Sequence, residues 1–169
     1  MAMIDLVRRV ARPFPGKRMA VGSLLHDGDG RLLIVDPPYR RGWSIPGGMI
    51  GRNESPRRAL EREVEEEVGL RRPPGRLLCV DYLSADGTRS EAVMMIFDGG
   101  VLVPDEIARI RLPRVELRGH AFHDPVVALD MVEPDLRKRI EAALAVGAGD
   151  APCYLEDGYP VQPGREIPG

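Results

Sequence analysis

A cluster of glutamates between residues 61 and 67 has the clearest chemical use in this sequence. Glu63, Glu66 and Glu67 are three and four residues apart, so a helix would place them on one face. Like charges at this spacing weaken a helix by roughly 0.2–0.5 kcal/mol per pair. A bound Mg²⁺ ion, which takes oxygen ligands, would offset the repulsion between these carboxylates. The alternative is a solvated acidic face, partly neutralised by Arg57, Arg58 and Arg62.

The helix that would carry these glutamates is predicted over residues 55–68. Ser55 is a suitable N-cap, Pro56 suits the first helical position, and Gly69 suits the residue that ends a helix. Apolar residues recur every four positions and predict a buried stripe formed by Leu60, Val64 and Val68. The glutamates are therefore expected on a helix that is anchored on its other side.

The same segment matches a known family motif at every specified position. The motif is Gly, five residues, Glu, seven residues, then Arg-Glu-aliphatic-X-Glu-Glu-X-Gly-aliphatic. The matching residues are Gly48, Glu54, Arg62, Glu63, Val64, Glu66, Glu67, Gly69 and Leu70. The chain therefore resembles the Nudix hydrolase family, in its MutT-like form, with a complete Nudix box at residues 48–70. Glu61 and Glu65 fall outside the pattern and are interpreted as solvated charges.

The resemblance implies a metal site and its supporting residues. In the family, glutamates at the positions of Glu63, Glu66 and Glu67 hold Mg²⁺ or Mn²⁺, with the backbone carbonyl of Gly48 as a further ligand. Arg62 would orient Glu63 or Glu66 through a salt bridge. The remaining box residues would support the site: Gly47 and Gly48 allow close approach of the backbone, Glu54 braces Arg62 or a second metal, and Gly69 ends the helix.

The resemblance also implies the reaction, which is hydrolysis of a nucleoside diphosphate linked to another moiety. Water would attack a phosphorus of the diphosphate with help from the metal. Catalytic roles would fall to Glu66, Glu67 and Arg62. The general base is not fixed within the family, so Glu67 in the box and Glu116 outside it are both candidates, with Glu106 as the rival of Glu116.

The expected substrate is a small nucleotide-type diphosphate rather than a nucleic-acid polymer. Arg40 and Arg41 could meet phosphates, and Trp43 could stack on a base, although packing beneath the box loop is the alternative for Trp43. His120 and His123 are interpreted as neighbours on one face of a strand. Downstream markers of the ADP-ribose, dinucleoside polyphosphate and NADH subfamilies are missing, which favours a MutT-like or general nucleotide pyrophosphohydrolase. The alternative function is a Nudix-fold nucleotide sensor or interaction module without turnover.

The remaining elements predict an α/β (α+β) fold with a mixed sheet between helices. Strands are expected at 19–26 and 31–35, joined by a turn as a hairpin, and at 76–84, 89–97, 107–112 and 115–123, and a helix at 134–146. The resemblance implies the Nudix α/β/α sandwich with the box as a loop–helix–loop. The expected organisation is a lead-in at 1–16, a Nudix domain at 17–146, and a Gly/Pro-rich tail at 147–169 without regular elements.

Composition is typical of a globular protein. The chain has 169 residues, 43% hydrophobic and 30% charged, with a net charge of −2, which argues against a general nucleic-acid coat. No segment has the roughly 18 apolar residues of a membrane span, and residues 1–16 do not resemble a signal peptide, so a cytoplasmic protein without a membrane partner is expected. Cys79 is predicted in the core, and a bridge to Cys153 has no support. Because many Nudix proteins are dimers, a homodimer remains open.

Overall fold

The computed structural model describes residues 16–39, 41–112 and 117–161. They contain an eight-stranded mixed sheet whose main path runs β6-β2-β1-β5-β4-β7-β8, with β3 paired to β1. The strands are β1 (Arg18–His26), β2 (Leu32–Asp36), β3 (Gly47–Met49), β4 (Leu77–Leu83), β5 (Ala92–Val101), β6 (Gly119–His123), β7 (Cys153–Glu156) and β8 (Tyr159–Pro160). The helices are α2 (Pro56–Val68), α3 (Pro104–Ala108), α4 (Pro125–Met131) and α5 (Pro134–Leu144).

The centre of the sheet is β1, which pairs in parallel with β5 and antiparallel with β2 and β3. The expected hairpin is confirmed: β1 and β2 are joined by a turn in which the Asp27 carbonyl accepts the Gly30 N–H at 3.0 Å. β3 pairs Gly48 with Val21 and Met49 with Ala20. This pairing fixes the start of the box against the middle of the sheet.

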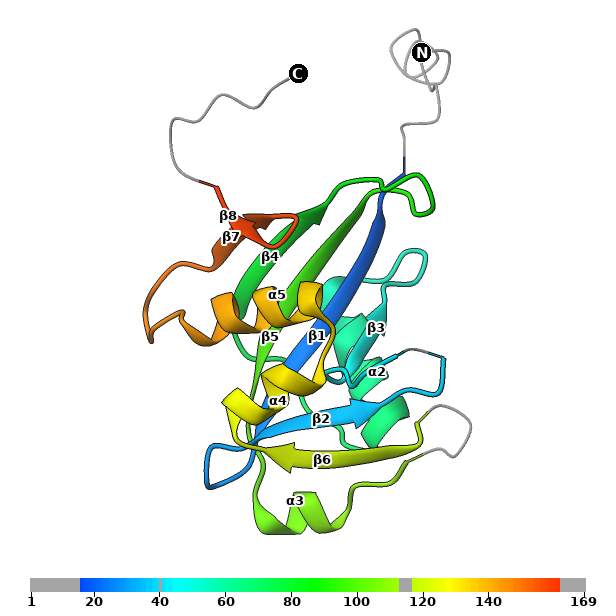
Figure 1. The fold of residues 1–169 in the computed structure, drawn as a ribbon. Coiled ribbons are helices and arrows are strands. Elements are labelled where there is room, and N and C mark those ends of the chain that lie inside the picture. The colour runs from blue at the N-terminus through cyan, green and yellow to red at the C-terminus, as the bar shows by residue number, and fades with distance from the viewer. Residues whose placement is uncertain (1–15, 40, 113–116, 162–169) are drawn as a thin grey trace, which may run out of the picture.

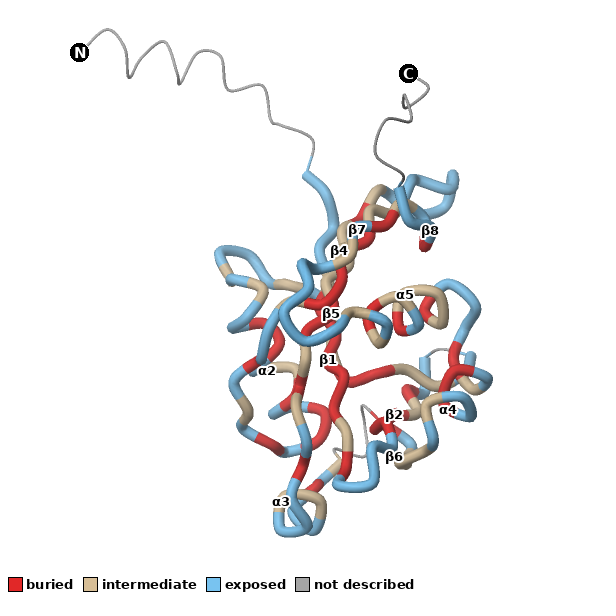
Figure 2. The backbone as a smooth tube through the Cα atoms, turned by 90° about the vertical axis from the view of Figure 1, so that its left-hand side faces the viewer, coloured by how far each residue is buried: buried red, intermediate tan, exposed pale blue. Residues whose placement is uncertain are grey.

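Two layers of helix cover the sheet, α2 on one face and α4 with α5 on the other (Figure 1). Figure 2 shows the sheet between them, with its buried residues along β1 and β5. One apolar cluster lies under α2 and includes Val21, Leu60, Val64 and Phe97. The other lies under α4 and α5 and includes Leu24, Cys79, Ile96 and Ile140. The α/β/α sandwich with a mixed sheet and the core position of Cys79 are thus confirmed.

Residues 107–112 do not form the expected strand. Ile107 belongs to the short helix α3, which begins at Pro104. The Glu106 carboxylate accepts the Val103 N–H at 3.0 Å, so the first helical turn is closed by a side chain of its own. Ile107 and Ile110 still pack on one apolar cluster, although the segment is not a strand.

The strand predicted over 115–123 is shorter than expected, and residues 113–116 lie outside the described part. β6 pairs antiparallel with β2 over residues 119–123. His120 lies edge-on to Phe122, with ring centroids 6.4 Å apart, as residues two apart on one face of a strand do. His123 is three residues from His120 and therefore points to the other face. The interpretation that the two histidines share a face was wrong.

The segment after α5 contains regular structure, contrary to the prediction. β7 pairs in parallel with β4, and β8 turns back on β7. Leu155 anchors β7 in the core with 1% of its surface exposed. The Asp81 carboxylate on β4 accepts the Gly158 N–H at 3.0 Å, and Asp157 accepts the N–H and hydroxyl of Ser84, both at 2.8 Å. Pairing with a distant strand overrides the high Gly/Pro content.

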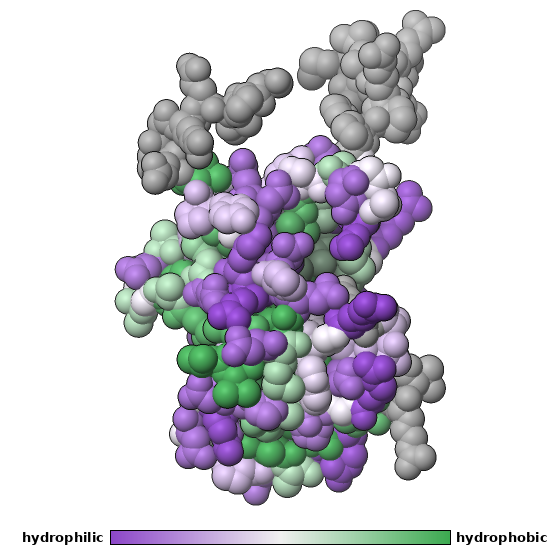
Figure 3. Space-filling model, viewed as in Figure 1, coloured by the Kyte–Doolittle hydropathy of each residue, from purple (hydrophilic) through white to green (hydrophobic). Residues whose placement is uncertain are grey.

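Helix α4 was not predicted, since it is short. The Asp124 carboxylate caps it by accepting the Val126 N–H at 2.9 Å, and Ala128 and Leu129 are buried. Val126 and Val127 are exposed, and Figure 3 shows an apolar patch there on a largely hydrophilic surface. Within the described residues, no helix has the length and apolarity needed to cross a membrane.

Candidate active site

Helix α2 has the caps that the sequence predicts. The Ser55 hydroxyl accepts the Arg58 N–H at 3.4 Å, and Gly69 ends the helix in the left-handed conformation with its N–H bound to the Glu65 carbonyl. The buried stripe faces the sheet and contains Leu60, Val64 and Val68, together with Ala59. This packing sets the rotation of the helix and thereby turns the box glutamates toward β3.

The two glycines of β3 permit unusually close packing against β1 and α2. Gly47 has φ +147°, and a Cβ atom there would lie 2.1 Å from the Val21 carbonyl oxygen. A Cβ at Gly48 would lie 2.5 Å from the carboxyl group of Glu63. A side chain at Gly48 would therefore displace the carboxyl group of Glu63, which the resemblance implies is a metal ligand.

Gly47→Ala is expected to destabilise the protein by at least about 2 kcal/mol, because backbone would have to move to relieve the clash. Urea unfolding measures this change. Gly28→Ala is the matched control, since a Cβ at Gly28 meets nothing within 4 Å, and it should leave the midpoint nearly unchanged. Equal stabilities of the two variants would contradict the close approach described for β3.

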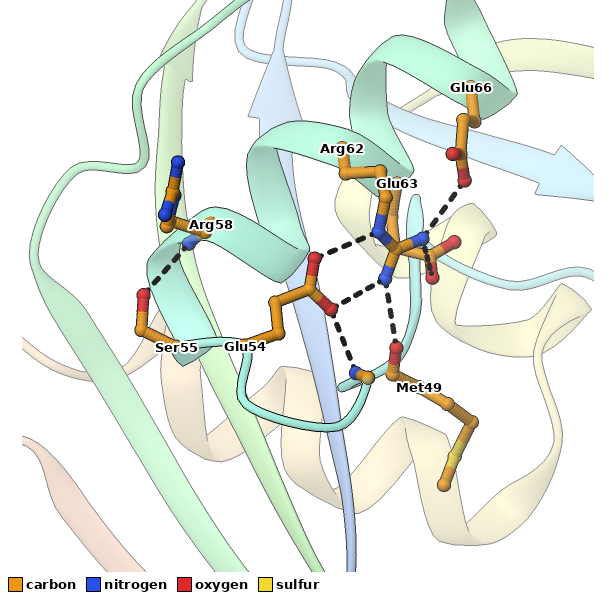
Figure 4. A network of polar contacts seen from close by, with 8 residues as sticks. Met49, Glu54, Ser55, Arg58, Arg62, Glu63 and Glu66 are labelled. Carbon is orange, nitrogen blue, oxygen red and sulfur yellow. Dashed lines mark hydrogen bonds and ion pairs between the residues drawn. The ribbon is translucent and has the colours of Figure 1, made fainter.

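Arg62 is the hub of the polar network between the box loop and the helix (Figure 4). Its Nε and Nη2 donate to the two carboxylate oxygens of Glu54, both at 2.9 Å, in a bidentate pair. Its Nη1 donates to Glu63 at 2.7 Å and to Glu66 at 2.9 Å, and its Nη2 also donates to the Met49 carbonyl at 3.1 Å. A single guanidinium thus positions three carboxylates and one loop carbonyl.

Arg62 contacts Glu54, and it contacts both Glu63 and Glu66, where the resemblance implied one or the other. Two backbone partners of the network were not found from the sequence: the Met49 carbonyl on Arg62 and the Gly51 N–H, which donates to Glu54 at 2.8 Å. Contacts made by backbone groups do not depend on residue type, so the sequence does not indicate them and they become visible only in the folded structure. The roles expected for these side chains remain proposals.

The charge of Arg62 lowers the pKa of Glu54 to about 2, chiefly through the hydrogen bonds from its guanidinium and next through the Gly51 N–H. The network in turn raises the pKa of Arg62, mainly through Glu54 and then Glu63. Glu54 therefore stays ionised in the folded protein at every pH at which the protein would work.

The lowered pKa of Glu54 predicts a pH-dependent contribution to stability. This contribution is fully present above the unfolded pKa of about 4.5 and is lost as the pH falls toward about 2. Wild type should therefore exceed Glu54→Gln in stability by more at pH 6 than at pH 3. Urea midpoints at the two pH values measure the difference, and an unchanged gap would show that the Glu54 charge does not stabilise the fold.

Glu67 lies deeper than the other box glutamates, with 7% of its surface exposed. Its carboxylate accepts the Gly47 N–H at 2.8 Å. This contact ties the helix to β3 at the point where the two glycines approach. Glu66 is about half-exposed at the side chain and Glu63 is mostly covered, so this wall of three carboxylates becomes more exposed from Glu67 through Glu63 to Glu66.

The chemistry of this wall fits a hard divalent cation, since its donors are carboxylate oxygens beside a backbone that can approach closely. Among the described residues, no three acidic, histidine or cysteine side chains already surround a common metal position. The Arg62 guanidinium holds Glu63 and Glu66 instead. Glu63 and Glu66 therefore already bind one cationic group, the Arg62 guanidinium.

Of the other predicted site residues, the structure describes Arg41, Trp43 and Glu106. Arg40 and Glu116 lie outside the described residues, and Arg41 is exposed. Trp43 is half-buried; its backbone N–H donates to the Met131 carbonyl, and its side chain packs on the cluster under α4 and α5. Glu106 pairs with Arg72 at 2.8 Å besides capping α3. Glu106 thus has a structural task that its place in the sequence did not reveal.

An open groove of about 560 Å³ runs along the outer side of α2 and reaches Glu54 and Arg62. Its charged lining is mixed and consists of Arg58, Arg62, Arg71 and Arg72 together with Glu54, Glu61 and Glu65. Arg71 pairs with Glu65 at 2.8 Å. The groove therefore brings guanidinium groups to the solvent side of the box.

The model of the NUDIX domain family matches residues 16–142 of the chain. The chain belongs to this family. Its structure is similar to a MutT protein from Methanosarcina mazei, with a TM-score of 0.65 and 23% identity over 77% of this chain and 94% of the other. It is also similar to a MutT NUDIX hydrolase from Burkholderia pseudomallei, with a TM-score of 0.59 and 23% identity over 79% of this chain and 100% of the other. These likenesses confirm the MutT-like fold.

Curated relatives of this NUDIX chain are matched over shorter stretches. An RNA pyrophosphohydrolase from Saccharophagus degradans is 50% identical over 56 residues, which cover 32% of this chain and 33% of the relative. Another from Hydrogenovibrio crunogenus is 36% identical over 73 residues, covering 42% of this chain and 44% of the relative. The chain thus spans less than half of the length of each of these two relatives.

Proposed function

We propose that this NUDIX protein hydrolyses a phosphoric anhydride bond, in a nucleoside diphosphate linked to another moiety, with the help of a divalent metal. The observation that carries the proposal is the ordered arrangement of the Glu63, Glu66 and Glu67 carboxylates, of which the first two bind Arg62 and the third binds the Gly47 N–H. Membership of the NUDIX family supports the same reaction. A purely structural acidic face would not require a glycine where a Cβ would meet the Glu63 carboxyl.

The metal would be Mg²⁺ or Mn²⁺, held by the three glutamates and the Gly48 carbonyl, and when bound it would neutralise the diphosphate and polarise a phosphorus. The chain's own residues set the geometry. Arg62 fixes Glu63 and Glu66 from one side. The Gly47 N–H fixes Glu67 from the other. Such preorganisation reduces the rearrangement needed when negative charge develops on the substrate.

Two residues are proposed as alternative candidates for the general base. Glu67 is the candidate within the box, because it is mostly buried and its orientation is fixed by a backbone N–H. Glu116 is the candidate outside the box. Substitution of the two residues should have different effects on metal dependence. A base outside the box can be replaced without disturbing the metal ligands. If Glu116 is the base, Glu116→Gln should lower turnover while its Mg²⁺ dependence matches wild type.

The substrate is proposed as a small nucleotide, with the 5′ triphosphate end of RNA as a second candidate. The second candidate rests on the relatives named RNA pyrophosphohydrolase. The groove with Arg58, Arg71 and Arg72 supports an anionic substrate of either kind, since guanidinium groups bind phosphates well. Arg41 and Trp43 remain proposed substrate contacts.

A substrate panel with Mg²⁺ and with Mn²⁺ tests the proposal. It contains nucleoside triphosphates, oxidised nucleotides, ADP-ribose, nucleotide sugars, dinucleoside polyphosphates and a 5′-triphosphorylated RNA oligonucleotide, with phosphate or pyrophosphate release as the readout. Turnover of a free nucleotide would support the first substrate class, and selective turnover of the oligonucleotide would support the second. Tight nucleotide binding without turnover of any panel member would favour a sensor and overturn the proposed hydrolase.

A further inference from the structure

Cys79 and Cys153 are neighbours across two paired strands, although 73 residues separate them in the sequence. The parallel register of β4 and β7 places Cys79 directly beside Cys153. Both side chains face α5: Cys79 belongs to the apolar cluster under that helix, and Cys153 packs against the same cluster. Both are free thiols in this structure.

The register satisfies the distance that a disulfide needs. Adjacent strands lie about 4.8 Å apart, and bridged cysteines have Cα atoms about 4.4–6.8 Å apart. A bridge between them therefore needs little movement of the backbone. Burial, and next the neighbouring Cys153 thiol, raise the pKa of Cys79, so Cys79 is the less reactive thiol of the pair.

The register is also held firmly by contacts around it. On β4, the Asp81 carboxylate binds the Gly158 N–H that follows β7, and it binds Arg139 of α5 at 2.5 Å. The Asp157 N–H donates to the Tyr82 carbonyl at 2.8 Å. β7 is thus fixed on β4 on the far side of the cysteine pair, and it cannot slide without breaking these bonds.

We propose that Cys79 and Cys153 form a redox modification site that closes to a disulfide between β4 and β7. The oxidant is a low-molecular-weight disulfide. The half-exposed Cys153 attacks one of its sulfurs as the thiolate and releases one thiol, which leaves a mixed disulfide on Cys153. Cys79 then loses its proton and attacks the Cys153 sulfur, which releases the second thiol. The pair gives up two electrons, and the small disulfide takes them.

The bridge would tie the C-terminal strand to the sheet and close a loop through β5, α3, β6, α4 and α5. Closing so long a loop restricts the unfolded chain strongly, so the melting temperature is expected to rise by about 10 °C. The order of attack follows from exposure: Cys79 is fully buried, so the small disulfide reaches Cys153 first.

The test treats the reduced wild-type protein with oxidised glutathione and compares it with Cys153→Ala. The intact mass of wild type should fall by two hydrogens without an adduct, and a digest without reductant should contain one peptide pair joining residues 79 and 153. The melting temperature should rise and should return after reduction. Cys153→Ala should show neither the linked peptides nor the shift.

Three results would overturn the proposal. Both thiols of wild type could still react with an alkylating reagent after oxidation. A glutathione adduct could persist on Cys153 while Cys79 stays reduced. The only linkage could be between two copies of the chain. Because the decisive measurement uses wild-type protein, the outcome does not depend on how well a variant folds, and it is independent of the proposed hydrolase activity.

Discussion

Glu66→Gln is expected to lower kcat/KM for the diphosphate substrate by at least about a hundredfold while the protein stays folded. Charge stabilisation by a catalytic metal is worth several kcal/mol, and each 1.36 kcal/mol is about tenfold in rate. The Glu66 side chain is 49% exposed, so the fold does not depend on it. Arg62 would keep its bonds to Glu54 and Glu63 in this variant.

The matched control is Glu61→Gln, which removes the same charge from the same helix. Glu61 is exposed, lies outside the box pattern and lines the groove on the outer side of the helix. Steady-state kinetics should show near wild-type kcat/KM for this variant, and circular dichroism should show equal folding for both. Full activity of Glu66→Gln, or an equal loss in Glu61→Gln, would contradict the assignment of the metal-binding face.

Asp81→Ala is expected to destabilise the protein by about 3–5 kcal/mol. Asp81 is fully buried, and its partner Arg139 is 12% exposed at the side chain. Removing the carboxylate leaves a nearly buried guanidinium without its ion pair and takes the acceptor from the Gly158 N–H. The loss should appear as a lower urea midpoint and a lower melting temperature.

Two further variants separate a buried pair from charge loss in general. Arg137→Ala removes an arginine of the same helix whose partners, Asp130 and Glu141, are exposed, so it should cost less than about 1 kcal/mol. Asp81→Leu combined with Arg139→Leu should recover much of the stability lost in Asp81→Ala, because no charge remains buried. A small effect of Asp81→Ala would show that Arg139 finds water or another partner.

Helix α2 and its box could be predicted because their signals are local. Ser55, Pro56 and Gly69 mark the ends of the helix, and the apolar stripe repeats every four residues. The contacts of Arg62 followed from the family motif rather than from spacing alone. Spacing by itself favoured a solvated acidic face over a metal site until the whole motif was considered.

The elements that could not be predicted depend on distant contacts or on short segments. β7 forms because it pairs with β4, and the sequence of residues 147–161 does not indicate this pairing. α3 has only five residues, too few for a helical period, and the Glu106 cap decides it. The half-buried place of Trp43 likewise comes from its contact with the α4–α5 layer. Glu116 remains a prediction.

Metal-dependent hydrolysis by the box glutamates is tested by phosphate release from wild type and from Glu67→Gln as the divalent metal is withdrawn and restored. We expect that EDTA stops turnover of the best panel substrate, that added Mg²⁺ or Mn²⁺ restores it, and that Glu67→Gln shows no comparable recovery. Turnover that persists in EDTA, or that Glu67→Gln retains in full, would contradict a metal-dependent hydrolase built on the box glutamates.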